Sequence, residues 1–293
     1  MAILQFGKTG QLARALQERA ALAGVAVAAL SRQDVEITDA AAVERAVADA
    51  TGIDLVINAT AFSLVDKAEG EPEEAFAVNA AAPGVMARAC ATRGLPFIHI
   101  STDCVFDGSG SRPRREDEPA RPINAYGRSK LAGEAAVLAA GGTSLVVRTS
   151  WVFSEYGANF VQIMLGMADR PQINVVDDQF ACPTPAAALA DFLLSLRGPL
   201  SGPDALRLAG VVHYVGDEPV NRFAFAQAVF AEAGLAPTLT PVPSSDFPTP
   251  AARPKNGVLD TTRLRRVFGT EPPPWRAALG PVIAKVQGKD KTA

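Results

Sequence analysis

Tyr126 and Lys130 form the residue pair in this sequence whose types and spacing most directly suggest chemistry. Side chains four positions apart lie on one face of a helix, so a phenol and an ammonium group can point into the same cleft. A nearby cation stabilises the phenolate and moves the phenol pKa from about 10 toward neutrality, where the group can transfer a proton. An ordinary amphipathic helix can carry the same two residues, so this interpretation needs support from elsewhere in the chain.

A glycine-rich turn follows the first apolar segment. Gly7 and Gly10 stand in a G-x-x-G-x-x-A pattern, and Gln11 and Leu12 open a segment with helical periodicity. Glycine lets the backbone approach a pyrophosphate closely, and the free N–H groups at a helix start attract its negative charge. The turn therefore predicts a dinucleotide site, although a tight strand-to-helix turn without a ligand has the same pattern.

The second predicted strand ends in Ser31 and Arg32, at the point where an NAD-specific enzyme usually carries an acid for the adenosine ribose. A hydroxyl and a guanidinium suit a 2′-phosphate better than a diol, which favours NADPH over NADH. We expect Glu36 and Ile37 to contact the same end of the cofactor. The acids Asp34 and Glu36 make the local charge mixed, and Arg32 can equally be a solvated surface residue, so NADH stays open.

The third predicted strand leads into small residues and then into a polar segment. Small residues leave room for a cofactor across the strand end, and the polar residues after them can face a substrate. We expect residues 59–61, including Ala61, to lie against a cofactor, and Val65, Asp66 and Lys67 to face a substrate. Asn79 in the next predicted helix is also assigned to the cofactor, although a mid-helix asparagine is usually a surface residue.

Thr102 and Asp103 follow the fourth predicted strand. Polar side chains directly after a buried strand lie at the edge where doubly wound sheets bind ligands. Thr102 can donate its hydroxyl to a carbonyl oxygen, whereas the same residues can also serve only to cap a turn. Because the helix that begins near Tyr126 must pack beside this strand end, we favour the functional interpretation.

The elements that position these residues alternate between strands and helices. Short apolar runs predict strands at residues 2–6, 25–30, 54–59, 96–101, 144–150 and 211–215. Helical periodicity predicts helices at residues 11–22, 39–50, 71–93, 157–169, 186–197 and 222–233. Apolar strands that alternate with helices indicate a parallel sheet buried on both faces, so the predicted fold is α/β with a Rossmann-type, doubly wound sheet.

Composition limits the class of protein. The 293 residues are 48% hydrophobic with a net charge of −3, and the basic residues are dispersed, so we expect a soluble globular protein without a nucleic-acid partner. No apolar run is long enough to cross a bilayer, and the first residues lack the basic start of a signal peptide. Three widely spaced cysteines fit buried thiols in a reducing cytoplasm.

Several motifs together resemble the extended short-chain dehydrogenase/reductases, and more narrowly the family of dTDP-4-dehydrorhamnose reductases. The motifs cover most of the chain: GKTGQL at 7–12, VDKAE at 65–69, STDCVFDG at 101–108, YGRSK at 126–130, RTSWVF at 148–153, DDQF at 177–180 and RPKN at 253–256. The Y-x-x-x-K pair marks only the superfamily, whereas VDKAE, DDQF and RPKN together are more specific.

The resemblance implies a role for each matching residue. Tyr126 would protonate the C4 ketone of dTDP-4-dehydro-β-L-rhamnose while NAD(P)H delivers a hydride. Lys130 would hold the nicotinamide ribose and stabilise the tyrosinate, and Thr102 would hydrogen-bond the ketone. The resemblance also implies that Ala61, Phe62 and Ser63 line the cofactor. Further predicted substrate contacts are Asp103, Phe106, Trp151, Asn159 and Arg253.

The sequence also departs from the family. Cys104 stands where a tyrosine is usual, so the pocket beside Thr102 can differ in shape. Some members hold Mg²⁺ at a dimer contact through a glutamate of the first helix. Arg14 and Ala15 stand there in this chain, so both the metal and that homodimer are in doubt.

The resemblance further implies two interleaved domains. The predicted cofactor domain comprises residues 1–150 with about 184–215, the substrate domain residues 151–183 and 216–286, and a flexible tail residues 287–293. Two other functions stay open: a sugar-nucleotide epimerase or dehydratase that recycles its cofactor, and a non-catalytic regulatory subunit.

Overall fold

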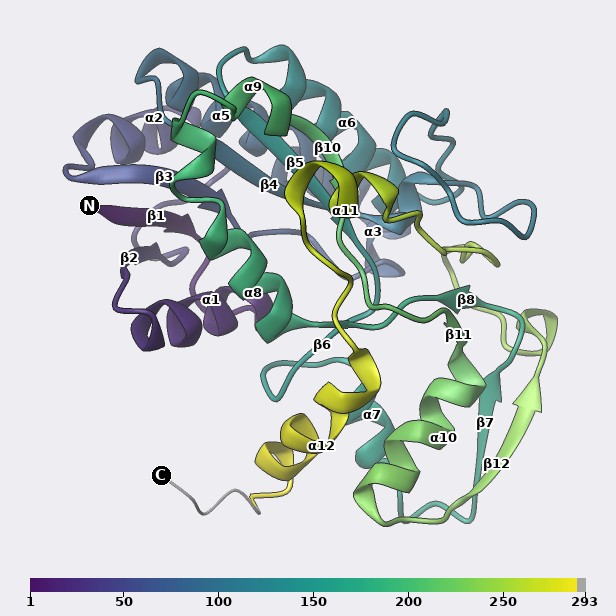
Figure 1. Ribbon diagram of the computed structural model, residues 1–293. Helices are drawn as coiled ribbons and strands as arrows, with labels where there is room; N and C mark the ends of the chain where they lie inside the picture. Colours follow the sequence, from purple (N-terminus) through teal and green to yellow (C-terminus); the bar gives the residue numbers. More distant parts are fainter. Residues whose placement is uncertain (289–293) are drawn as a thin grey trace.

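A six-stranded sheet forms the centre of the computed structural model, which describes residues 1–288 (Figure 1). The strands lie in the order β10, β5, β4, β3, β1, β2, and every neighbouring pair is parallel. Their bounds are Ala2–Phe6 for β1, Ala26–Leu30 for β2, Ile53–Asn58 for β3, Phe97–Thr102 for β4, Ser144–Thr149 for β5 and Gly210–His213 for β10. The predicted doubly wound parallel sheet is confirmed.

Helices cover both faces of this sheet, because successive side chains of a strand point to opposite sides. On β1, Ile3 belongs to a core shared with α1, α8 and α11, whereas Leu4 belongs to a core shared with α2, α5 and α6. These helices span Gln11–Leu22 (α1), Ala40–Asp49 (α2), Ala82–Thr92 (α5), Ala125–Ala139 (α6), Ala186–Ser195 (α8) and Thr262–Phe268 (α11). Burial on two faces explains why the strands are continuously apolar.

The helix expected over residues 71–93 is instead interrupted. It consists of α4 (Pro72–Phe76), a π-helical turn η1 (Ala77–Ala81) and α5, and the short α3 (Lys67–Gly70) precedes it. Pro83 has no N–H and its ring would collide with the carbonyl four residues earlier, that of Asn79, so a regular α-helix cannot continue there. The turn lets α6 approach closely: a Cβ on Gly133 would lie 2.0 Å from the Asn79 carbonyl oxygen.

The second half of the chain adds a smaller group of elements below the sheet in Figure 1. Phe225 and Trp275 lie at its centre, 5.2 Å apart in an edge-to-face arrangement, and both are fully buried. The group contains α7 (Phe160–Leu165), β7 (Gln172–Val176), α10 (Arg222–Ala233), β12 (Thr238–Val242) and α12 (Trp275–Val286). The strands β7 and β12 pair in parallel.

Short elements connect these two parts. The two-residue strands β6 (Val152–Phe153) and β9 (Thr184–Pro185) pair in parallel, and β8 (Phe180–Ala181) and β11 (Val220–Asn221) pair antiparallel. The remaining turns are η2 (Asp103–Val105), η3 (Pro199–Ser201), α9 (Ala205–Leu208) and η4 (Ser244–Asp246). Within residues 1–288, no helix combines the length and apolarity that a membrane span requires.

The structure differs from the sequence expectations at three further places. The helix expected at 157–169 begins only at Phe160, because Asn159 caps it. Residues 238–242, where no strand is expected from the sequence, form β12, and Pro241 is tolerated there because β12 lies at the edge of a two-stranded sheet. Leu264 of α11, which the predicted division gave to the substrate domain, packs in the core of the large sheet. Residues 289–293 of the predicted tail lie outside the described residues.

Candidate active site

In the strand order, β1 lies between β2 and β3, so the chain leaves β1 toward one side of the sheet and later returns to the other side. Sheets of this type bind ligands in the crevice at the carboxyl ends of the strands at such a point. Gly7, directly after β1, adopts a φ of +98°, and a Cβ there would lie 3.1 Å from the backbone of Ala59. Gly10 is the N-cap of α1, so no side chain covers the N–H groups of its first turn. This backbone cradle fits a pyrophosphate, which is the group that a dinucleotide would place there.

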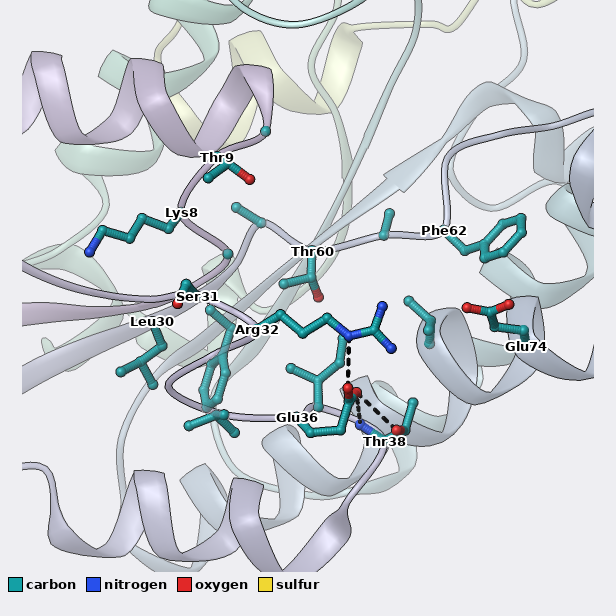
Figure 2. Close-up of a pocket in the computed structure, with 18 residues that line it drawn as sticks. Lys8, Thr9, Leu30, Ser31, Arg32, Glu36, Thr38, Thr60, Phe62 and Glu74 are labelled. Carbon is teal, nitrogen blue, oxygen red and sulfur yellow. Dashed lines mark hydrogen bonds and ion pairs between the residues drawn. The ribbon is translucent and has the colours of Figure 1, made fainter.

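A cavity of about 470 Å³ extends from this turn toward β2 (Figure 2). Its lining includes Ser31, Arg32, Glu36 and Ile37, as predicted, and also Lys8, which sequence reasoning missed. In Figure 2, Arg32 reaches across the cavity, and its Nε donates to Glu36 Oε2 at 2.8 Å. The charge at this end of the crevice is therefore mixed, with two cations available to an anionic group.

A second cavity of about 320 Å³ continues from the first along the sheet edge, and the two share Gly10, Ala59, Thr60 and Ala61. Gln11, Leu12 and Ser63 also line it, as do Thr102, Tyr126 and Lys130. Thr149 lines the same cavity, and its buried hydroxyl has no hydrogen-bond partner within residues 1–288. A continuous trough with a free hydroxyl in its wall has the shape and polarity for an extended dinucleotide.

Lys130 lies on α6 with its side chain almost fully buried, one turn after Tyr126. Its Nζ donates to the carbonyl of Ile100 at 2.6 Å, which ties α6 to β4. Burial lowers the pKa of Lys130 to about 8, although Glu134 acts in the opposite direction. Asn124 caps the helix by accepting from Gly127 N–H at 2.7 Å, so the helix start beside Tyr126 is fixed.

The phenol of Tyr126 differs from the sequence expectation. Burial raises its pKa above the ordinary value of 10, the nearby Cys104 and Asp103 raise it further, and only a hydrogen bond with Thr102 lowers it. Lys130 does not lower this pKa as expected, because burial, which disfavours the charged phenolate, has the largest effect. A phenol with a raised pKa stays protonated at neutral pH, which is the form that donates a proton.

A third cavity of about 250 Å³ opens on the other side of Tyr126, and it is lined by Val65, Asp103, Trp151 and Arg253 among others. Within residues 1–288, Trp151 is the only residue other than glycine with a positive φ, 43°. Such a backbone conformation costs about 1–3 kcal/mol for an ordinary side chain and is typical of functional sites. The surrounding fold therefore holds the indole at this cavity although the backbone of Trp151 by itself would favour a negative φ.

Arg222, at the start of α10, is a residue of this cavity that sequence reasoning missed. Its guanidinium lies 4.0 Å from the ring centroid of Trp151 and 5.1 Å from that of Phe160. Burial lowers its pKa to about 10, although the negative Asp103 opposes this. In the sequence, Arg222 stands out only because it follows Asn221, which caps the helix. Its place in the cavity could therefore be found only from the tertiary structure.

Asp103 is 6% exposed and faces the same cavity. Burial raises its pKa to about 6, while hydrogen bonding from Thr102 and the charge of Arg222 act against this rise. Gly257 packs on the carboxyl group, since a Cβ there would lie 2.4 Å from Asp103 Oδ2. The carboxylate is thus held between Thr102, Arg222 and the backbone of a distant loop.

A fourth cavity of about 780 Å³ adjoins the third and shares Gln179, Arg222 and Arg253 with it. Its other lining residues are mostly apolar side chains of α7 and β7, with Phe247 from the loop after η4. Arginines at the boundary between a small polar cavity and a larger apolar one suit a ligand with a sugar, a diphosphate and a base in sequence.

Five predicted residues are positioned differently from the expectation, and two of them are Asn159 and Phe106. Asn159 caps α7 by accepting from Val161 N–H at 3.1 Å, and its amide donates to the backbone of Ser154. Phe106 is 1% exposed and packs in the core under the site, away from the third cavity. Their buried positions leave no side-chain atom free toward a ligand, because capping and packing use these atoms.

The other three are Asp66, Lys67 and Asn79, and none of them is among the lining residues of these four cavities. Lys67 pairs with Glu71 at 2.8 Å, and its neighbour Asp66 pairs with Arg253 at the same distance. Asn79 is buried and clamps Phe62: it accepts from Phe62 N–H at 2.9 Å and donates to Phe62 O at 3.1 Å. Asn79 therefore positions the backbone of a cofactor-lining segment and does not itself line the trough.

The described residues do not support the Mg²⁺ site that the resemblance left in doubt. Within residues 1–288, no three side chains of His, Cys, Asp or Glu gather as a metal site would require. Arg14, which stands where the resemblance implied a possible magnesium-binding residue, instead stacks on the ring of Tyr156 at 4.7 Å.

The comparisons with known proteins decide the family. The model of the RmlD substrate binding domain matches residues 1–287. A dTDP-4-dehydrorhamnose reductase of Sinorhizobium fredii is 38% identical over 291 residues, which cover 97% of this chain and 98% of the relative. The chain belongs to the dTDP-4-dehydrorhamnose reductase family.

Solved structures of this family share the whole fold. The Clostridium acetobutylicum reductase superposes with a TM-score of 0.91 at 32% identity, covering 98% of this chain and 100% of that one. The Bacillus anthracis reductase, solved in complex with NADP, has a TM-score of 0.90 at 30% identity and covers 97% and 100%. The expected oxidoreductase class and Rossmann architecture are thus confirmed at the level of the family.

Proposed function

We propose that this protein reduces the C4 ketone of dTDP-4-dehydro-β-L-rhamnose to give dTDP-β-L-rhamnose, with NADPH as the hydride donor. The observation that carries the proposal is the meeting of Thr102, Tyr126 and Lys130 in one cavity that continues into the dinucleotide trough. Family membership supports the substrate, and the complex of the Bacillus anthracis relative with NADP supports the cofactor.

Each residue would have a distinct task. Tyr126 donates its phenolic proton to the ketone oxygen, Thr102 holds that oxygen by a hydrogen bond, and Lys130 binds the nicotinamide ribose and stabilises the tyrosinate. Bound NADPH supplies the hydride to C4. The raised pKa of Tyr126 keeps the proton on the phenol until the ketone is in place.

The substrate would lie across the third and fourth cavities. Trp151 would contact the sugar, and Arg222 and Arg253 would pair with the diphosphate, because a guanidinium binds two phosphate oxygens at once. The apolar fourth cavity would then receive the base. Lys8 and Arg32 would favour the 2′-phosphate of NADPH at the other end of the trough.

Tyr126→Phe tests the catalytic assignment. The variant should bind NADPH normally and turn over at least ~100-fold more slowly, the low end of what a positioned acid contributes. Tyr156→Phe is the matched control, because the Tyr156 hydroxyl contacts Glu18 outside the cavities, and it should keep normal turnover. Near-normal turnover of Tyr126→Phe would refute the proposed role.

The same assay separates the other functions. A reductase consumes one NADPH for each substrate molecule, whereas an epimerase or dehydratase that recycles its cofactor consumes none. A regulatory subunit would show neither activity. Parallel measurements with NADPH and NADH give the cofactor preference. The cytoplasmic location, the homodimer and the two-domain boundaries stay predictions, and gel filtration with light scattering tests the dimer.

A further inference from the structure

His99 is a buried titratable residue to which the proposed reaction gives no task. It lies on β4 and is 0% exposed, with its Nε2 facing Lys130 Nζ at 3.2 Å and its Nδ1 facing Asn58 Nδ2 at 3.1 Å. A neutral imidazole carries a proton on one ring nitrogen only, so the partners decide which nitrogen donates toward Lys130.

The orientation of Asn58 settles the tautomer. Asn58 Oδ1 lies 2.9 Å from the backbone N–H of Thr60, which can only donate, so this atom must be the acceptor oxygen. The other end of the amide is then the NH2 group, and it donates to His99 Nδ1. His99 Nδ1 is therefore an acceptor without a proton, and the imidazole proton lies on Nε2, directed at Lys130.

An N–H directed at Nζ acts against an ammonium group. An ammonium has three donors and no acceptor, whereas a neutral amine has a lone pair that can accept from His99 Nε2–H. Lys130 Nζ already donates to the carbonyl of Ile100. The amine form of Lys130 thus satisfies both neighbours, and the ammonium form satisfies only one of them.

We propose that His99, fixed in its Nε2–H tautomer by Asn58, is a positioning residue that weakens the hold of Lys130 on its proton. Lys130 would then alternate between ammonium and amine near neutral pH and could return a proton to the Tyr126 phenolate after each reduction. This step moves one proton from Nζ to the phenolate oxygen and leaves a neutral amine, which takes its next proton from water in the cavity that Lys130 lines; it involves no change of oxidation state. The inference rests on the proposed roles of Tyr126 and Lys130.

Other charged groups around Lys130 act on the same equilibrium. Glu134 lies one turn later on α6 and favours the ammonium, but Arg148 of β5 neutralises it at 2.6 Å. Asp103 lies at the end of β4, where its charge acts on Tyr126. The pKa of Lys130, which burial lowers to about 8, is consistent with a group poised between its two forms.

His213 provides an internal comparison, because the chain contains only two histidines. It is also fully buried, but its Nδ1 lies 3.0 Å from the carbonyl of Asp260, to which it must donate. Its Nε2 is then free to accept from Arg148. The two histidines should therefore adopt opposite tautomers, His99 with the proton on Nε2 and His213 with it on Nδ1.

Nitrogen-15 NMR of the histidine rings in the intact protein tests the tautomer without any substrate. Between pH 6 and 9 we expect two sets of ring nitrogen signals, one from an Nε2–H imidazole and one from an Nδ1–H imidazole. The Nε2–H set should be absent from the spectrum of His99→Phe. Two Nδ1–H tautomers, or an imidazolium at His99, would overturn the proposal. This measurement stands even where the proposed substrate turns out to be wrong.

The pH profile of turnover tests the effect on Lys130. As pH rises, Lys130 loses its proton and turnover should fall, with a midpoint near its pKa of about 8. His99→Phe removes the opposing N–H, and Asn58→Asp forces His99 to donate from Nδ1 and turn an acceptor toward Lys130. Both should move the midpoint upward by about one pH unit, because a hydrogen bond to a charged group is worth about that much.

His213→Gln is the control, since it alters a buried histidine that does not face Lys130, and its midpoint should match that of the unmodified protein. A lower turnover with an unchanged midpoint in both His99→Phe and Asn58→Asp would show that His99 only supports the fold. That result would overturn the proposal even with the expected tautomer.

Discussion

Gly127 offers a sharp test of whether the geometry around Tyr126 sets the rate. It lies on α6 directly after Tyr126, and a Cβ added to it would lie 2.1 Å from the carbonyl oxygen of Cys104. Carbon and oxygen atoms that touch normally lie about 3.3 Å apart. Gly127→Ala must therefore move the start of α6 away from the Cys104 backbone by about 1.2 Å.

This displacement acts on the catalytic groups because α6 carries Tyr126 whereas Thr102 precedes Cys104 on the opposing strand end. A shift of about 1 Å in a reacting group can lower turnover about 100-fold. Overpacking of this kind also destabilises a protein by about 1–3 kcal/mol. NADPH binding should change much less, since the glycine turn at residues 7–10 lies on another element.

The assay compares turnover, NADPH affinity and urea unfolding of Gly127→Ala with those of Gly198→Ala. Gly198 has helical backbone angles, and a Cβ there meets no atom within 4 Å, so the control should leave all three quantities unchanged. Turnover of Gly127→Ala within about threefold of the unmodified protein, with full stability, would refute the reasoning from close packing.

Two further predictions concern buried charges. Glu134 and Arg148 form an ion pair at 2.6 Å with both side chains at most 5% exposed, so Arg148→Met should lower the free energy of unfolding by about 3–5 kcal/mol in urea titrations. The double variant Arg148→Met with Glu134→Leu should recover most of this loss, because it also removes the unpaired carboxylate. If the double variant loses as much stability as Arg148→Met or more, the unpaired charge of Glu134 is not the cause. Because burial raises the pKa of Asp103 from 3.8 to about 6, its folded form binds more protons than its unfolded form, and stability should fall by about 3 kcal/mol as pH rises from about 4 through 6. Asp103→Asn should remove this part of the pH dependence, and an unchanged unfolding profile between pH 4 and 7 would contradict the assignment.

The sequence alone determined the local chemistry and the fold class. Apolar strands buried on both faces must be continuously hydrophobic, so their positions and the α1 and α10 helices could be predicted from residue type. The glycines at 7 and 10 predicted the cofactor turn, and the structure shows why Gly7 is needed: its φ is +98° and a Cβ there would lie 3.1 Å from the backbone of Ala59. The spacing of Tyr126 and Lys130 placed both on one helical face.

Contacts between distant segments could not be predicted in this way. Arg222 reaches Trp151 because Phe225 of the same helix, α10, stacks on the Trp151 ring with centroids 6.1 Å apart, and Asn159 and Phe106 turned out to serve capping and packing. The pairing of β7 with β12 likewise joins segments that lie far apart in the chain.

Tertiary structure also decided the protonation chemistry. The sequence predicted a phenol whose pKa falls beside a lysine, whereas burial raises the pKa of Tyr126 and lowers that of Lys130. Spacing along a helix fixes which groups meet, but the loss of water around them depends on the strands and loops that close over the site. Removal of water disfavours every charged form, and this effect is set by the whole fold.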